Sequence, residues 1–369
     1  MFFFFEVFDL SYFDTTKNRD IQLIKKQNQN KKTKTKSFSI KMPTIAVTYN
    51  ATVGGVSVIS LKKAFQTVGC HVVDADYRLC ATGVHSDVFE RPELDRKIWS
   101  LLKEKAKFLL QDVHCLVLSG SNAMIDPQLF NQQREYDKKY DFSRVMSELA
   151  FIHIAVNKGM PILGICAGHQ LISVYFGGTL KNLNTQELIQ QNFHGDDVIY
   201  FRSGCFLTQL IGQDAQSFFG SHRQVVDKLG NGLETCGIAS DYHSNEAFES
   251  KYGAPIICTQ FHPEVSVHGF ENTLPNLSAR KSSIDIFEFI KGAAETYRQK
   301  LIVLNSLKTV RLQESNMTPF WKQLVKFCFG FWIVLVYLCK RWVHNRKTKN
   351  YQETTSNNLS SPFFMFNNS

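Results

Sequence analysis

Cys166 stands in a sequence context that suits a thiol nucleophile. The stretch PILGICAGHQLISVYFGGTL, residues 161–180, begins as a buried strand, turns sharply at CAG and continues with apolar residues at helical spacing. The small residues Gly164, Ala167 and Gly168 allow so tight a turn to close. A cysteine at a helix N-terminus lies at the positive end of the helix dipole, which favours the thiolate over the thiol. The backbone N–H that follows it can stabilise an oxyanion.

A thiol nucleophile needs a general base, and the base needs a group that orients it. The stretch PIICTQFHPEVS, residues 255–266, reads as a buried strand that delivers His262 at its end, with Glu264 two residues later. Side chains two apart on an extended segment point the same way, so Glu264 can accept from one ring nitrogen of His262 and leave the other for sulfur. Each motif alone also fits a purely structural role, but together they predict a Cys–His–Glu triad with Cys166 as nucleophile.

The elements that position these residues alternate between strands and helices. We predict strands at 44–49, 70–75, 113–120 and 161–166, and helices near 56–68, 92–110 and 144–158. This alternation predicts parallel βαβ units and an α/β fold with a doubly wound, mostly parallel sheet. Ligands bind beyond the carboxyl ends of the strands in such sheets. Gly120 and Cys166 both lie at such ends, so we expect them to face one crevice.

Charge is distributed unevenly along the 369 residues, whose formal net charge is +9. Residues 1–42 carry a net +5 and residues 301–369 a net +7, which leaves −3 for residues 43–300. The mildly acidic middle argues against a nucleic-acid groove on the folded core. The basic tails instead suit anionic membranes or other acidic surfaces.

Nine cysteines are scattered along the chain without a CxxC pair or a Cys/His cluster at zinc spacing. An odd number of dispersed cysteines in a long chain is typical of reduced thiols in a cytosol-like compartment. The sequence therefore predicts no metal and no cofactor, and it predicts a cytoplasmic catalytic domain.

Composition divides the chain into five segments. Residues 1–42 form a basic extension that we predict to be disordered, because so polar a stretch cannot build a core. The catalytic domain is expected at 43–301 and ends in an amphipathic helix over 282–301. The segments predicted to follow are a linker, 302–323, a hydrophobic membrane-associated segment, 324–343, and a basic and polar tail, 344–369.

The segment 324–343 carries the membrane prediction. Its central run, 327–339, is uncharged and spans about 20 Å as a helix, which is short of a hydrocarbon core of about 30 Å. If the flanking Lys326, Lys340 and Arg341 snorkel, the whole segment can cross. We predict a membrane-embedded helix, with an interfacial helix or a buried core helix as the alternatives.

Several motifs in order resemble one known family. GICAGHQL (164–171) and FHPE (261–264) are similar to the class I glutamine amidotransferase superfamily, and most similar to its branch of stand-alone γ-glutamyl hydrolases, the peptidase C26-like group. Three further segments resemble that branch: CLVLSGSNAMIDPQLF (115–130), FGGTLKNL (176–183) and SHRQVVDKLGNGL (221–233). The resemblance implies a flavodoxin-like sheet for this part of the chain.

The resemblance also implies a reaction, the hydrolysis of a small-molecule γ-glutamyl amide through a γ-glutamyl thioester. Cys166 would attack the γ-carbonyl, His262 would protonate the leaving amine and then activate water, and Glu264 would orient His262. Gly120 and Ala167 would supply the oxyanion N–H groups. The residues that would contact the glutamyl group or line its pocket are Gln170 and His222.

Two departures from the family pattern leave substrate choice open: Ser119-Gly120-Ser121 replaces a double glycine, and Arg223 replaces a histidine. Three function classes follow. The first is a γ-glutamyl amide hydrolase, and the second is a glutaminase subunit that delivers ammonia to a separate synthetase chain. The third is a catalytically idle, membrane-tethered binding module, against which the intact Cys, His and Glu argue.

Overall fold

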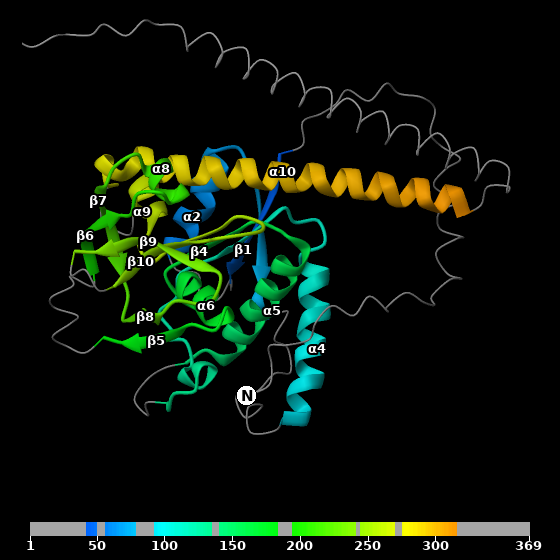
Figure 1. Ribbon diagram of the computed structural model, residues 1–369, viewed down its shortest axis with the longest axis horizontal. Coiled ribbons are helices and arrows are strands. Elements are labelled where there is room, and N and C mark those ends of the chain that lie inside the picture. Colours follow the sequence, from blue (N-terminus) through cyan, green and yellow to red (C-terminus); the bar gives the residue numbers. More distant parts are fainter. Residues whose placement is uncertain are drawn as a thin grey trace, which may run out of the picture. The chain divides into compact units, whose positions relative to one another are not determined.

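The computed structural model in Figure 1 describes residues 42–49, 56–78, 92–134, 140–183, 194–240, 244–269 and 275–315. The chain divides after Met42, and every described helix and strand belongs to the unit that begins at Pro43. Within these ranges, each helix is too short or too polar to span a bilayer. The predicted extension before Met42 and the hydrophobic segment 324–343 lie outside the described residues.

A nine-stranded sheet forms the centre of the fold, in the order β2-β1-β3-β4-β11-β10-β9-β6-β7. Its parallel half consists of β2 (His71–Asp76), β1 (Thr44–Tyr49), β3 (Cys115–Leu118), β4 (Ile162–Ile165) and β11 (Ile256–Thr259). Its antiparallel half consists of β10 (Asn245–Ser250), β9 (Leu233–Ala239), β6 (His194–Phe201) and β7 (Ala215–Ser221). A separate antiparallel pair is made by β5 (Thr179–Asn182) and β8 (Gln224–Lys228).

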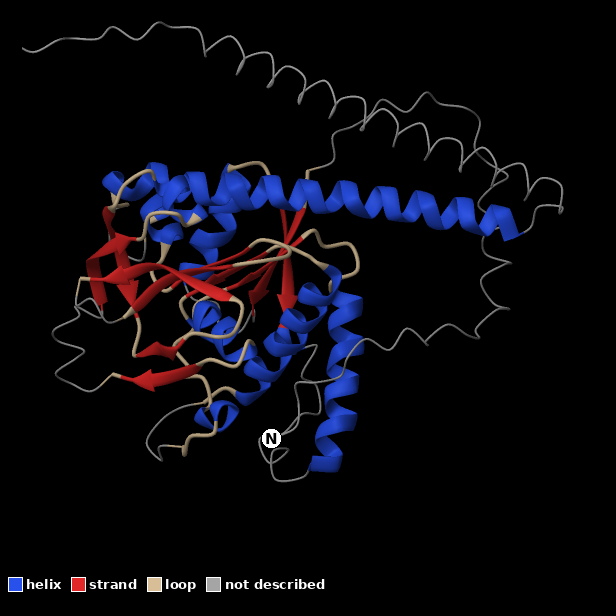
Figure 2. Cartoon of the chain, in the orientation of Figure 1, coloured by secondary structure: helices blue, strands red, loops and turns tan. Residues whose placement is uncertain are grey.

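Helices cover both faces of this sheet (Figure 2). The strand side chains alternate between two hydrophobic cores, as period-two geometry requires: on β3, Leu116 and Leu118 enter one core, and Cys115 and Val117 enter the other. The first core is covered by α4 (Pro92–Leu109), α5 (Phe142–Lys158) and α6 (Ala167–Tyr175). The second is covered by α2 (Val56–Thr67), α9 (Pro263–His268) and α10 (Leu277–Ser315). The predicted α/β fold with a doubly wound sheet is confirmed, and five of the nine strands form its parallel half.

The remaining short helices are η3 (Pro127–Phe130), which lies after β3, and α8 (Phe206–Ile211), which lies after β6. The predicted helix at 282–301 is longer in the structure, because α10 starts at Leu277 and continues to Ser315. Ile286, Phe287 and Ile290 are fully buried and fix its first part on the core. The apolar stripe ends near Tyr297, which is why the sequence pattern predicted an earlier end.

Candidate active site

Three neighbouring parallel strands bring the predicted site residues together. β3 and β11 flank β4, with Leu118 paired to Gly164 and Thr259 paired to Ile165. Parallel strands end at the same edge of a sheet, so the residues that follow them meet there. Gly120 follows β3, Cys166 follows β4, and His262 follows β11. One edge of the sheet therefore holds Gly120 and Cys166, as the sequence predicted, and the segment that carries His262 ends there too.

Cys166 occupies a strained turn between β4 and α6. Its φ of 54° and ψ of −107° lie in a region that residues with a side chain rarely adopt. Its N–H donates to the carbonyl oxygen of Thr259 at 2.8 Å, which ties the turn to β11. The helix begins with Ala167, and the first N–H groups of a helix have no acceptor within it. The side chain is buried, so charges at this turn interact more strongly than they would in water.

The small residues around Cys166 are required by the packing of the turn. A Cβ atom added to Gly164 would lie 2.6 Å from Ile172 Cδ1. A Cβ added to Gly168 would collide with the carbonyl oxygen of Leu118 and lie 2.6 Å from its Cβ. The backbone of α6 thus approaches β3 as closely as glycine allows, as the sequence pattern indicated.

We expect Gly168→Ala to lower the free energy of unfolding by about 3 kcal/mol, because the new methyl group overlaps the backbone of Leu118. Gly292→Ala is the matched control, since no atom lies within 4 Å of an added Cβ there and the residue sits in α10. Alanine favours a helix over glycine by up to about 1 kcal/mol, so this control should not be destabilised. Urea unfolding measures both variants, and equal stability of the two would contradict the packing argument.

His262 and Glu264 form the hydrogen bond that the sequence predicted, but the backbone between them has a different conformation. The Nδ1 atom of His262 lies 2.7 Å from Oε1 of Glu264, and both side chains are buried. The prediction assumed an extended segment, and this is wrong. Glu264 lies in the first turn of α9, which Pro263 begins with His262 as its N-cap. Proline suits the first helical position because it has no N–H to satisfy, and the turn places the two side chains together.

Electrostatics keep His262 protonated more strongly than an isolated histidine. Burial lowers the pKa of its imidazole, but the charge of Glu264 and the hydrogen bonds with Cys166 and Glu264 raise it more. The pKa of His262 therefore lies well above its ordinary value. This arrangement places the imidazole of His262 between the sulfur of Cys166 and the carboxylate of Glu264.

Gly120 lies directly beside the sulfur and the imidazole. A Cβ added to Gly120 would lie 3.0 Å from His262 Cε1 and 3.8 Å from Cys166 Sγ, so only glycine fits without displacing the pair. The thiol of Cys166 donates to the carbonyl oxygen of Ser221 at 3.6 Å, at the end of β7. Sequence reasoning missed Ser221, since the pairing of β6 with β7 leaves no local signal in the chain.

Two further predicted residues lie in buried polar networks. The side-chain amide of Gln170 donates to the carbonyl oxygen of Gln224 at 2.6 Å and to Oε1 of Gln260 at 2.9 Å. Nε2 of His222 lies 3.7 Å from Oε1 of Glu246. The structure thus gives both residues partners within the protein, and substrate contact by either one stays a prediction.

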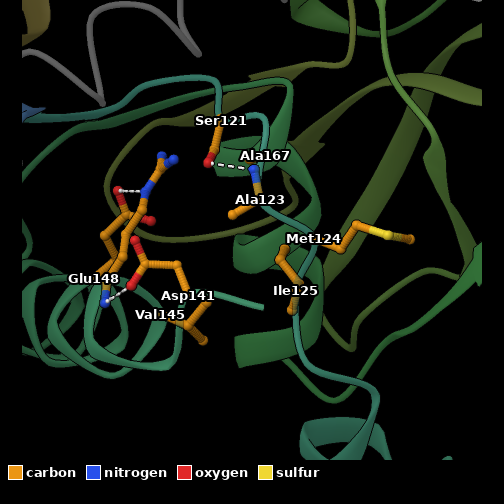
Figure 3. A pocket seen from close by; sticks show the side chains of 9 residues that line it. Ser121, Ala123, Met124, Ile125, Asp141, Val145, Glu148 and Ala167 are labelled. Atoms are coloured by element: carbon orange, nitrogen blue, oxygen red, sulfur yellow. Dashed lines mark hydrogen bonds and ion pairs between the residues drawn. The ribbon is translucent and has the colours of Figure 1, made fainter. Parts of the chain in front are cut away.

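A small pocket lies beside Ala167 (Figure 3). One wall is the loop after β3, from which Ser121, Ala123 and Met124 contribute, and Oγ of Ser121 accepts from the N–H of Ala123 at 3.0 Å. The opposite wall is the start of α5. The residues that complete the lining are Ile125, Asp141, Arg144, Val145, Glu148 and Ala167. The loop after β3 and the start of α5 therefore border the turn at Cys166.

The described residues include one group that could hold a metal ion: the ligand atoms of Cys205, Cys236 and Glu249 lie within 4.8 Å of one another. The carboxylate of Glu249 accepts from the N–H groups of Phe206 and Leu207, each at 2.9 Å, and so caps α8. Both thiols donate to backbone carbonyls. The group comes from three separate segments, which is why sequence spacing did not indicate it, and its members are satisfied as parts of the fold.

Comparison with known proteins shows the family of this chain. The family model described as Peptidase C26 matches residues 58–264, more than half of the chain. A protein of Rickettsia bellii named for ankyrin repeats is 31% identical over 291 residues, which is 73% of this chain and 45% of that protein.

Two further relatives carry names from amide chemistry. A Mycobacterium tuberculosis protein named as a glutamine amidotransferase is 30% identical over 172 residues, which is 44% of this chain and 54% of that protein. One subunit of a glutamine-hydrolysing GMP synthase from Methanocaldococcus jannaschii is 32% identical over 123 residues, which is 33% of this chain and 61% of that subunit. The chain thus spans less than two thirds of the length of each of these three relatives.

Proposed function

Because the chain belongs to the peptidase C26 family, within the class I glutamine amidotransferase superfamily, we propose that it hydrolyses γ-glutamyl amide bonds through a thioester on Cys166. The observation that carries this proposal is the group of residues at the adjacent ends of β4 and β11. There, a buried His262–Glu264 hydrogen bond of 2.7 Å stands beside a cysteine held in a strained turn. A histidine oriented by a carboxylate next to an activated thiol is the arrangement that nucleophilic acyl transfer requires.

The first half of the proposed reaction forms the thioester. The Cys166 thiolate attacks the γ-carbonyl carbon, and the electron pair of the C=O bond moves to oxygen. The N–H groups of Gly120 and Ala167 bind this oxyanion. The tetrahedral intermediate then collapses: the carbon–nitrogen bond breaks, and the imidazolium of His262 gives its proton to the leaving amine.

The second half releases glutamate. Neutral His262 takes a proton from water, the hydroxide attacks the thioester carbon, and the carbon–sulfur bond breaks. The thiolate and the imidazolium are restored, so no external oxidant, metal or cofactor enters the balance. Glu264 holds Nδ1 of His262 throughout, which leaves Nε2 for the proton transfers. Gln170 and His222 are proposed to line the site for the glutamyl group.

We propose that the leaving amine of the substrate lies at the pocket beside Ala167, which has room for about one water-sized group. It adjoins the proposed oxyanion site and is bordered by charged groups from α5 as well as by apolar side chains. The alternative is a glutaminase subunit that passes ammonia to a synthetase chain. The likeness to one GMP synthase subunit favours that alternative.

We expect the purified chain to hydrolyse γ-glutamyl amides or peptides alone, releasing glutamate and an amine, because the proposed catalytic groups all come from one chain. A panel of γ-glutamyl compounds that includes glutamine, assayed with and without cell extract, measures this. Cys166→Ala protein in the same extract controls for other enzymes. Turnover that needs extract and accepts only glutamine would replace the proposal with the alternative of a partner-dependent glutaminase.

A further inference from the structure

A buried polar network holds the loop that carries Gly120. The N–H of Ser119 donates to Oγ1 of Thr48 at 3.2 Å, and the hydroxyl of Ser119 donates to the carbonyl oxygen of Thr48 at 2.8 Å. Nη2 of Arg144 donates to the carbonyl oxygen of Ser119 at 2.7 Å. The exposed fractions of Thr48, Ser119 and Arg144 are 1%, 3% and 7%. Ser119 thus has its N–H, hydroxyl and carbonyl engaged at the end of β3.

The Ser119 carbonyl determines where the Gly120 N–H points. Both groups belong to one planar peptide unit, and in a trans peptide the C=O and N–H vectors are antiparallel. The described residues contain no cis peptide bond. Because Arg144 on α5 holds the carbonyl oxygen, the Gly120 N–H is directed away from Arg144. Gly120 itself lies beside His262 and Cys166, so an N–H held in one fixed direction there can serve as an oxyanion donor.

Arg144 can fix the carbonyl because its own guanidinium is fixed. Its Nε donates to Oε1 of Glu148 at 3.0 Å, one helical turn along α5, and the exposed fraction of Glu148 is 2%. Glu148 also makes a side-chain hydrogen bond with Thr48. Thr48, Ser119, Arg144 and Glu148 therefore form a closed network in which a planar, forked donor joins α5 to the loop. Asp141 caps the same helix by accepting from the N–H of Arg144 at 3.0 Å.

The other end of the loop is held separately. The side chain of Gln224, on β8, accepts from the N–H of Ile125 at 2.8 Å and donates to the carbonyl oxygen of the same residue at 3.3 Å. The loop is thus anchored on both sides of Gly120, and of the contacts named here the one from Arg144 acts on the peptide that carries the oxyanion donor.

We propose that Arg144 is a positioning residue for catalysis, which sets the direction of the Gly120 N–H by holding the Ser119 carbonyl, with Glu148 fixing its guanidinium. This inference rests on the proposed function. It assigns a role to a residue that contacts neither the nucleophile nor the base. It also gives Ser119 a structural role, because the serine hydroxyl supplies the bond to Thr48.

Arg144→Lys tests this role while keeping the charge opposite Glu148. A single ammonium group cannot donate to Glu148 and Ser119 in the geometry of the guanidinium fork. We expect kcat for a γ-glutamyl amide to fall about 10- to 100-fold with KM within about threefold, since a displaced oxyanion donor weakens the transition state alone. Arg78→Lys is the matched control, because Arg78 makes an exposed two-point pair with Asp76 on the outer strand β2.

Two reagents separate positioning from general damage to the site. Glutamate γ-semialdehyde adds to the Cys166 sulfur and develops an oxyanion, so its affinity should fall in parallel with kcat. Iodoacetamide alkylates the same sulfur without an oxyanion at the reacting carbon, so its rate should change less than about threefold. If Arg144→Lys is too unstable to purify, the Arg144→Gln/Glu148→Gln double variant removes both charges and is measured in the same way.

The outcomes are distinct. Unchanged kcat and aldehyde affinity in the variants would overturn the inference, and so would alkylation that slows as much as turnover. A wild-type chain that hydrolyses none of the γ-glutamyl compounds would overturn the proposed function instead. The ratio of aldehyde affinity to alkylation rate would still report whether Arg144 positions the donor.

Discussion

Cys166→Ala is expected to lower kcat for γ-glutamyl hydrolysis by about 10⁵-fold or more, because no other group can form the thioester. The variant should keep its fold, since only a buried sulfur atom is removed and the strained backbone is shared by both residues. Turnover of the wild type and the variant on an accepted substrate measures the loss. Mass spectrometry after treatment with a glutamine-like electrophile should find the adduct on Cys166.

A second cysteine provides the control. Cys70 is buried, and burial raises the pKa of its thiol to about 12, so it should be inert as a nucleophile. Cys70→Ala should therefore keep wild-type turnover and show the same adduct on Cys166. If the Cys166→Ala protein still hydrolyses substrate at the wild-type rate, the thioester mechanism is wrong.

His262→Ala should lower kcat nearly as much as loss of the nucleophile does. Glu264→Gln should lower kcat by a factor about one hundredfold smaller, because the orienting residue does not carry the proton. The glutamine side chain keeps the size of Glu264 but can present its amide group to Nδ1 in either orientation. Stopped-flow measurement of amine release compares the two variants. Equal losses would indicate that the carboxylate does more than orient the imidazole.

Glu264→Gln should also change how kcat/KM depends on pH. The charge of Glu264 raises the pKa of His262, so its removal should lower that pKa. The imidazolium that protonates the leaving amine is then lost at a lower pH. The alkaline limb of the profile of kcat/KM against pH should therefore move to lower pH in Glu264→Gln. A limb that stays in place would mean that another group donates the proton.

The parts of the site that depend on short segments were predictable from the sequence. The turn at Cys166 is encoded by a strand, small residues and a helix in one run of twenty residues, and the order of strands places Gly120 and His262 beside it. The contact between His262 and Glu264 was also predicted, although its assumed extended backbone was wrong. A proline after His262 starts α9, whereas the sequence analysis expected His262 and Glu264 to lie on one extended segment.

The residues that sequence reasoning missed are held in place by tertiary contacts. Ser221 reaches the sulfur because the end of β7 lies against the segment that follows β11, where the N–H of His262 donates to the carbonyl oxygen of Phe219 at 2.8 Å. Arg144 reads as one more basic residue at the start of a helix, and only its burial against Ser119 and Glu148 gives it significance. Long-range pairing of this kind leaves no periodicity in the chain, so the structure was needed to find it.

The backbone conformation at Cys166 bears on how selection has treated this chain. A non-glycine residue at a φ of 54° carries a conformational cost of about 1–3 kcal/mol, which a glycine would relieve. Drift in a protein that no longer needed a thiol would be free to take that substitution, since it asks nothing of the neighbouring packing. Under the proposed function, a cysteine at this position trades thermodynamic stability for reactivity.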